Sequence, residues 1–190
     1  MEKLILVAII LLAFAAMCFI MPMWTHNEEK KPKDYYNLKP EDIDTIPDEE
    51  LENAVVQWLF SKIDTKGTTE VPIMRAMPKA CRYVYAVYTV SGEVFSSGFG
   101  VTIGSMDSFI LSTAIEGLLD MGAGKLAGIL EQACAVAGEH IRENGRDMSL
   151  LEQNEQLAHL SAEFEACNEA VELSDILVKY IKNNKDYFGD

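Results

Sequence analysis

The chain contains few of the residues that build metal centres and redox sites. Its 190 residues include three histidines and four cysteines, and no C-x-x-C or H-E-x-x-H pair occurs among them. No segment fits the spacing of an EF-hand loop. Cys81, Cys134 and Cys167 are too widely spaced for a disulfide framework, so we expect buried free thiols. The sequence predicts no metal site and no cofactor.

The glycine-rich segments lack the spacing of phosphate-binding loops and nucleophile turns. "GAGK" at 122–125 would need a glycine at position 119 and Ser or Thr at 126, and both are leucine. "EVFSSGFG" at 93–100 does not contain G-x-S-x-G, because Val94 stands two residues before Ser96. We therefore expect a helix turn at "GAGK" and no catalytic residue. A hydrolase that uses the Glu93–Gly100 region is kept as an alternative.

Positive charge is also scarce. The chain has 16 Lys and Arg against 30 Asp and Glu, which gives a formal net charge of -14. Such a surface repels nucleic acid and anionic lipid, and it attracts basic partners. The strongest excess runs from 139 to 172, where two arginines accompany nine acidic residues: 139, 143, 147, 152, 155, 163, 165, 169 and 172.

Five of these carboxylates recur outside a Leu and Phe stripe and form the candidate partner face: Glu152, Glu155, Glu163, Glu165 and Glu169. Carboxylates along a rigid helix can imitate a row of phosphates and bind a basic groove. The alternative is an ordinary solvated helix face whose acidity is incidental, on a membrane-associated protein of unknown role.

The first long segment has no charge at all. Residues 4–24 would form a helix of about 30 Å, which is long enough to cross a membrane. A cleaved signal peptide has a shorter apolar core and a small-x-small cleavage site, whereas this segment ends in bulky "FIMPMW". The pattern predicts that residues 1–24 are a membrane anchor or an uncleaved signal. Lysines 30, 31 and 33 follow it and only Lys3 precedes it, which favours a cytoplasmic domain.

The remaining sequence predicts a polar linker at 25–44 and one helical domain at 45–190. Thr45 can cap a first helix that ends near Gly67, with three acids in its first turn. A helical hairpin follows at 106–145, then one helix at 149–170 with Leu150 inward, and a last apolar face at 173–181. "RYVYAVYTV" at 82–90 is ambiguous, since its aromatic and β-branched residues favour a strand but its stripe also suits a helix.

Three blocks of this domain resemble the C-terminal domain of the DNA-mimic protein family, a domain of unknown function. The family pattern is roughly E-V-x-N-G-G-F, then a helix ending in I-G-A, then Y-I-x-x-x-x-x-x-F. Ser96 and Ser97 stand where the family has Asn-Gly. The resemblance extends from about 45 to 190 and matches Glu93, Val94, Gly98, Phe99, Gly122, Tyr180, Ile181 and Phe188.

The resemblance implies an all-α, compact bundle of about five to seven helices, in addition to the one N-terminal transmembrane helix. It implies that 82–90 is a buried helix. We also expect Gly98 to permit a bend or a close approach, Phe99 to fill the core and Glu93 to be a polar tie. The family name implies an acidic surface that occupies DNA-binding proteins. The expected function is a non-enzymatic, membrane-anchored acidic interaction module that binds a basic protein.

Overall fold

The computed structural model describes residues 34–63, 70–145 and 147–189. Residues 35–190 form one folded unit. The predicted span at 4–24 and the first part of the predicted linker lie outside the described residues. Within the described ranges, no helix is both long enough and apolar enough to cross a membrane.

The fold of the described residues is all-α, which confirms the predicted class. The described part holds the α-helices α2 to α9, which is more than the predicted five to seven. Two of them are short, because α3 has seven residues and α7 has five. The elements are η1 (Pro40–Asp44), α2 (Asp48–Lys62), α3 (Glu70–Ala76), α4 (Lys79–Ser105), α5 (Ser108–Asp120), α6 (Gly124–Asn144), α7 (Met148–Glu152), α8 (Glu155–Val171), α9 (Leu173–Asn183) and η2 (Lys185–Tyr187).

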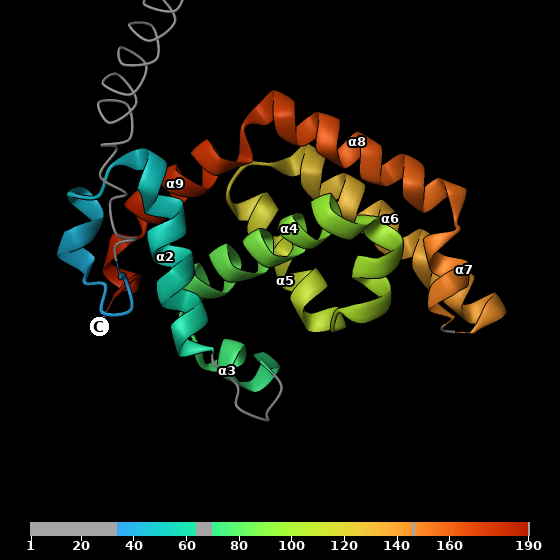
Figure 1. The fold of residues 1–190 in the computed structure, drawn as a ribbon, viewed down its shortest axis with the longest axis horizontal. Coiled ribbons are helices and arrows are strands. Elements are labelled where there is room, and N and C mark those ends of the chain that lie inside the picture. The colour runs from blue at the N-terminus through green and yellow to red at the C-terminus, as the bar shows by residue number, and fades with distance from the viewer. Residues whose placement is uncertain (1–33, 64–69, 146, 190) are drawn as a thin grey trace, which may run out of the picture. The chain divides into compact units, whose positions relative to one another are not determined.

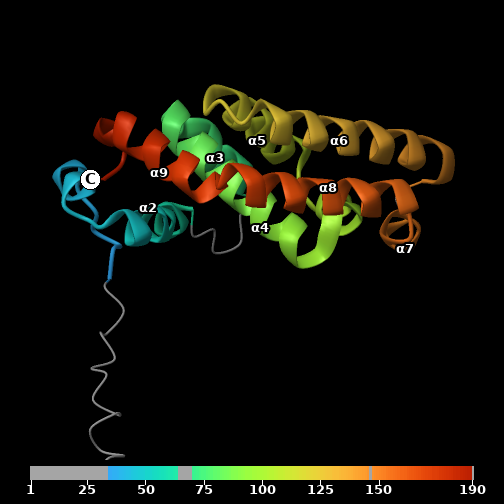
Figure 2. The same ribbon diagram turned by 90° about the horizontal axis from the view of Figure 1, so that it is seen from above.

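Helix α4 is the centre of the bundle. Helices α2, α5, α6, α7, α8 and α9 all contact it. Figure 1 shows it in the middle of the fold, and Figure 2 shows its bent second half beside α8. The ambiguous segment at 82–90 lies inside α4, as the resemblance implies. Val84, Val87 and Val90 are at most 1% exposed, so packing on several sides outweighs the strand propensity of the segment.

The folded unit begins about ten residues before the expected boundary at 45. Leu38 and Ile43 are buried in the core, although their segment was expected to be linker. The Tyr35 hydroxyl donates to Glu50 at 2.9 Å. Thr45 ends η1 and does not cap α2, whose N-cap is Pro47 and makes no side-chain bond. The end of the first predicted helix, near Gly67, lies outside the described residues.

The predicted helix at 149–170 is two helices. Asn154 interrupts it, because the Asn154 side-chain oxygen accepts from the amides of Gln156 and Leu157 and so caps α8. The prediction for Leu150 was wrong, since this side chain is 41% exposed. Leu157 is buried as predicted. Helix α8 therefore begins at Glu155 with its apolar side against the bundle.

Candidate protein-interaction surface

The segment at 93–100 forms a bend in α4. Gly98 has φ 74° and ψ 170°, which lies in a region that L residues rarely occupy. The amide of Phe99 leaves the helical pattern there and donates to the Ser161 hydroxyl of α8 at 2.9 Å. The Ser161 hydroxyl donates in turn to the Leu157 carbonyl at 2.9 Å. The bend is thus held by a buried contact between two helices.

The side chains of this segment behave largely as expected. Val94 and Phe99 are fully buried, and the Phe99 ring meets Phe164 edge-on at 5.5 Å. The Glu93 carboxylate makes no hydrogen bond or ion pair with the described residues, so the expected polar tie is not seen there. The segment supplies a core plug and a bend.

Two further glycines let α7 approach α4 closely. A methyl group on Gly100 would lie 2.5 Å from the Leu151 carbonyl oxygen, and one on Gly104 would collide with the Met148 sulfur. At Gly100 only hydrogen fits, because the atoms in the way belong to the backbone, whereas at Gly104 the flexible Met148 side chain would have to shift. The sequence "GFGVTIG" therefore bends α4 at Gly98 and then seats α7 against its last turns.

The second family block is the turn between α5 and α6. Gly122 has φ 84° and follows the C-cap Met121. Its amide donates to the Leu119 carbonyl at 3.1 Å, and the Ala123 amide donates to the Leu118 carbonyl at 2.8 Å. This pair of bonds is a Schellman motif, which requires a left-handed residue at the position of Gly122. The predicted helix turn is confirmed.

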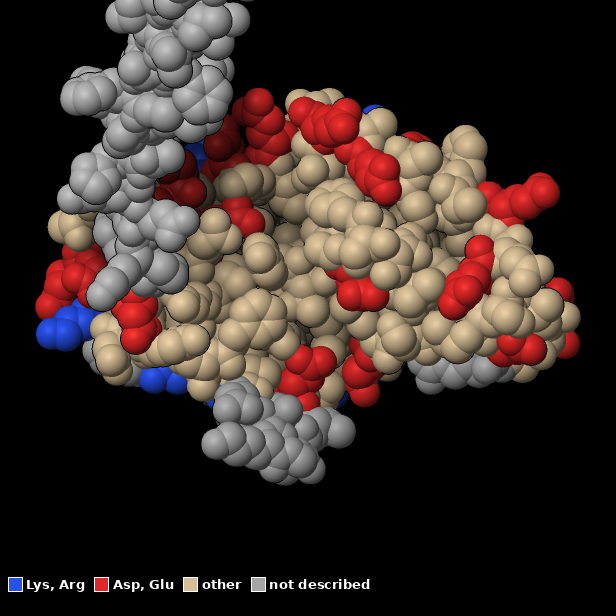
Figure 3. Space-filling view, viewed as in Figure 1, with Lys and Arg blue, Asp and Glu red and all other residues tan. Residues whose placement is uncertain are grey.

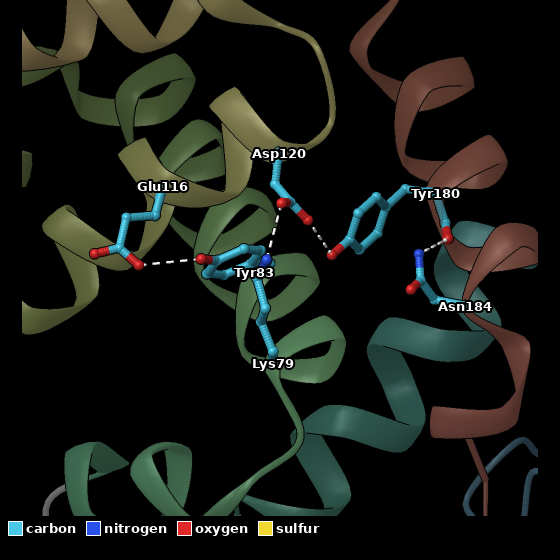
Figure 4. A network of polar contacts seen from close by, with 6 residues as sticks. All are labelled: Lys79, Tyr83, Glu116, Asp120, Tyr180 and Asn184. Atoms are coloured by element: carbon cyan, nitrogen blue, oxygen red, sulfur yellow. Dashed lines mark hydrogen bonds and ion pairs between the residues drawn. The ribbon is translucent and has the colours of Figure 1, made fainter.

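The third block ties α9 to the bundle. The Tyr180 hydroxyl donates to Asp120 at 2.9 Å, and the Lys79 ammonium donates to the other oxygen of Asp120 at 2.8 Å (Figure 4). The Tyr83 hydroxyl, beside Lys79, donates to Glu116 at 3.1 Å. Asp120 thereby joins α4, α5 and α9. The Lys79 hydrogen bond, followed by that of Tyr180, lowers the pKa of Asp120.

The rest of the third block is core. Ile181 and Phe188 are fully buried. The Cys81 thiol lies 3.0 Å from the Tyr187 carbonyl oxygen, and burial raises its pKa to about 12. Cys134 is half-buried, and burial raises its pKa to about 11. Both remain thiols near neutral pH, and Cys81, Cys134 and Cys167 are all free, as predicted.

The five glutamates of the candidate partner face are all exposed. Glu155, Glu163, Glu165 and Glu169 lie on α8, whereas Glu152 is the last residue of α7. At 100° per residue, the four on α8 fall on the side away from the buried Leu157 and Phe164. Four exposed alanines lie among them on this side: 158, 162, 166 and 170. The geometry is an open acidic helix surface.

The basic side chains that form ion pairs within the described chain lie on other elements. Lys182 pairs with Asp48, Lys185 pairs with Asp44 at 2.5 Å, and Lys79 pairs with Asp120. Between 131 and 172, the one described Lys or Arg is Arg142, and none of the acidic residues there forms an ion pair within the described chain. These residues are Glu131, Glu139, Glu143, Asp147, Glu152, Glu155, Glu163, Glu165, Glu169 and Glu172.

Figure 3 shows the charged residues on one face of the molecule. Asp and Glu lie at both ends and along the upper and lower edges, whereas Lys and Arg show mainly towards the left. In Figure 1 the right-hand end of this view holds α7 and the adjoining end of α8. The carboxylates of α7 and α8 therefore lie exposed and away from the ion pairs.

The serines of the segment at 93–100 have no neighbouring base, among the described residues, that would activate them as nucleophiles. Ser96 and Ser97 are exposed, and the Ser96 hydroxyl donates to the Glu93 backbone carbonyl at 3.1 Å. Ser97 lines a hollow between α4 and α8, but no histidine, lysine or arginine lines it. His159 is exposed on α8. In the described part of the chain, no group of three or more His, Cys, Asp or Glu could hold a metal ion.

Comparison with known proteins now adds to this geometry. A family model described as DMP19-like protein matches residues 75–184, which is more than half of the chain. The chain belongs to the DMP19-like family. The match supports the predicted resemblance to a DNA-mimic domain of unknown function. Searches of curated proteins and of solved structures gave no match.

The DMP19-like region is shorter than the expected range of 45–190. It begins at the end of α3 and runs through α9, so η1 and α2 precede it. Its central α4 carries the Gly98 bend, and its last helix carries Tyr180.

Two contacts of the site join residues that are far apart in the sequence, and neither was predicted from the sequence. Ser161 is 62 positions away from Phe99, and Asp120 is 60 positions away from Tyr180. A serine on the apolar side of α8, between Leu157 and Phe164, was the one available hint for the first. No spacing in the sequence indicates that Asp120 accepts the hydrogen bond of Tyr180.

Proposed function

We propose that this chain is a non-enzymatic interaction module whose acidic surface binds a basic, DNA-binding protein by imitating the charge of DNA. The surface consists of Glu152, Glu155, Glu163, Glu165 and Glu169. The observation that carries the proposal is that these exposed carboxylates have no cationic partner among the described residues. Membership of the DMP19-like family supports it.

Unpaired carboxylates on a helix attract a basic partner over a long range. The attraction is screened within about 8 Å at physiological ionic strength, so binding should weaken with salt. A protein that binds DNA already carries cations that suit such a row. The same surface repels nucleic acid itself, so the chain is not expected to bind DNA or RNA directly.

The test uses the full chain, immobilised and exposed to an extract of the cells that make it. We expect it to retain DNA-binding proteins at low salt, to release them at high salt, and to release them when duplex DNA is added. Competition by DNA shows that partner and duplex use the same surface. Retention of no salt-sensitive basic protein would contradict the proposal.

We also propose that residues 4–24 anchor the module in a membrane, with the folded domain in the cytoplasm. The uncharged length of this segment and the lysines that follow it support the proposal. Fusion of green fluorescent protein and of alkaline phosphatase to the C-terminus tests the side. Fluorescence without phosphatase activity is expected, and phosphatase activity alone would place the domain away from DNA-binding proteins of the cytoplasm.

A further inference from the structure

A hollow of about 280 Å³ lies where the bend of α4 faces α8. Its walls are short because the bend requires glycine at 98 and close packing requires glycine at 100, while α8 contributes Ala158 and Ala162. Phe99, Leu157 and Ser161 also line it. The hollow is thus built from the segment that identifies the family.

Two carboxylates complete the lining, and both belong to the candidate partner face. Glu152 comes from the end of α7, beside Gly100, and Glu165 comes from α8. Leu157 and Glu165 are eight residues apart, which is about 12 Å along a helix. Neither carboxylate forms an ion pair or hydrogen bond with the described residues. The hollow therefore combines small walls with two unpaired negative charges from different helices.

We propose that this hollow receives an arginine side chain of the basic partner. The inference rests on the proposed function and makes it more specific. The aliphatic stem of arginine can lie against the small and apolar walls, while its planar guanidinium can donate two parallel bonds to a carboxylate. Lysine suits the site less, because its ammonium is a compact and strongly hydrated charge.

The hollow differs in kind from the rest of the acidic surface. Glu163 and Glu169 also lie exposed on α8, but they do not line the hollow. Such open carboxylates attract any cation and discriminate little between partners. A concave site with charges in its lining can select by shape, which is how an arginine anchor gives specificity to an interface.

The first test separates the hollow from general charge. The full chain is titrated against fluorescent octa-arginine, and the double variant Glu152→Gln/Glu165→Gln is compared with Glu163→Gln/Glu169→Gln. Each pair removes two charges. We expect the first pair to weaken octa-arginine binding by about tenfold and the second by about two- to threefold. Octa-lysine binding should fall by the same small factor in both.

The second test leaves charge unchanged. Ala162→Leu would fill the hollow, whereas Ala166→Leu places the same side chain on the exposed side of α8 away from it. We expect about fivefold weaker octa-arginine binding for Ala162→Leu and no change for Ala166→Leu. Thermal melting of each variant, followed by circular dichroism, checks that the fold is kept.

The outcomes distinguish the two levels of the proposal. Equal losses in both glutamine pairs, together with normal binding by Ala162→Leu, would overturn the arginine site and leave the general acidic surface intact. If the unaltered chain shows no salt-sensitive binding of octa-arginine, the proposed function fails and the hollow fails with it. Selective loss at the hollow, in both tests, supports the site.

Discussion

At Gly98 the backbone takes a conformation that other residues adopt only with strain. A Cβ atom there would also lie 3.3 Å from the Ser161 hydroxyl, which is the group that accepts from Phe99. The bend and the fully buried Phe99 were predicted from the family motif. Their partner Ser161 was not, because a hydrogen bond across 62 residues leaves no periodic or local pattern.

Gly98→Ala is expected to lower the free energy of unfolding by about 1–3 kcal/mol, because a positive φ is strained for alanine and its methyl group would crowd Ser161. Gly92→Ala is the matched control, since Gly92 is an exposed helical residue of α4 with open space around its α-carbon. It should stabilise by about 0.5–1 kcal/mol. Urea denaturation measures both, and equal effects of the two changes would show that the bend is not strained.

Ser161→Ala removes the acceptor of the buried Phe99 amide. We expect a loss of about 1–3 kcal/mol in the free energy of unfolding, which is typical of leaving a buried donor unsatisfied. Ser112→Ala serves as control, because the exposed Ser112 hydroxyl only bonds within its own helix. If the two variants unfold at the same urea concentration as the unaltered chain, the contact contributes nothing to the bend.

Among the elements, the helices with a clear apolar stripe and a capping residue were predicted well. From the sequence, Asp107 or Ser108 was expected to cap α5, and the cap is Asp107; α6 ends at its C-cap Gly145, which has φ 75°. The separation of α7 from α8 was missed, because the Leu stripe continues past Asn154 while the cap interrupts the backbone. The segment at 82–90 of α4 was ambiguous, because a helix that is buried on several sides and a buried strand can have the same apolar, aromatic and β-branched composition.

The junction of α4, α5 and α9 should show a pH dependence through Asp120. Its pKa in the folded chain is lowered, so its contribution to stability is present above the unfolded value near 3.9 and is lost as the pH falls through the folded value. At pH 6 we expect the unaltered chain to have a higher free energy of unfolding than the Asp120→Asn variant. The difference should be less than about 1 kcal/mol, because the Lys79–Asp120 ion pair is partly exposed.

Once the pH falls below the lowered pKa of Asp120, that difference should close, since both chains then carry an uncharged group at position 120. Urea denaturation of the two chains at several pH values between 2 and 7 measures the gap. A gap that does not change over this range would show that the ion pair with Lys79 does not stabilise the junction.

Over the whole molecule, charge is distributed unevenly. Cations of α4, α9 and η2 pair with carboxylates of η1, α2 and α5, and the carboxylates of α6, α7 and α8 have no such partners among the described residues. The acidity was evident from composition. Which carboxylates are paired was not, because pairs such as Lys182 with Asp48 join residues 134 positions apart.

The row on α8 is less dense than DNA. Glu155 to Glu169 spans about 21 Å and holds four carboxylates, whereas duplex DNA carries one charge for every 1.7 Å or so of its axis. Imitation of DNA therefore requires the neighbouring carboxylates of α6 and α7 as well. The proposed membrane anchor remains a prediction from the uncharged segment at 4–24.

One measurement tests the central claim most directly, and it compares three immobilised full chains. The first is unaltered, the second carries Glu155→Gln, Glu163→Gln, Glu165→Gln and Glu169→Gln on α8, and the third carries Glu41→Gln, Glu49→Gln, Asp175→Asn and Asp186→Asn. Both variants remove four charges at exposed positions. The quantity measured is the DNA-binding protein that each chain retains from cell extract at low salt.

The account predicts that the unaltered chain and the third chain retain similar amounts, while the α8 variant retains little. The reason is that a basic partner follows the arrangement of the unpaired carboxylates on α8 rather than the net charge alone. Equal retention by the two variants, or full retention by the α8 variant, would contradict the claim that this helix surface imitates DNA.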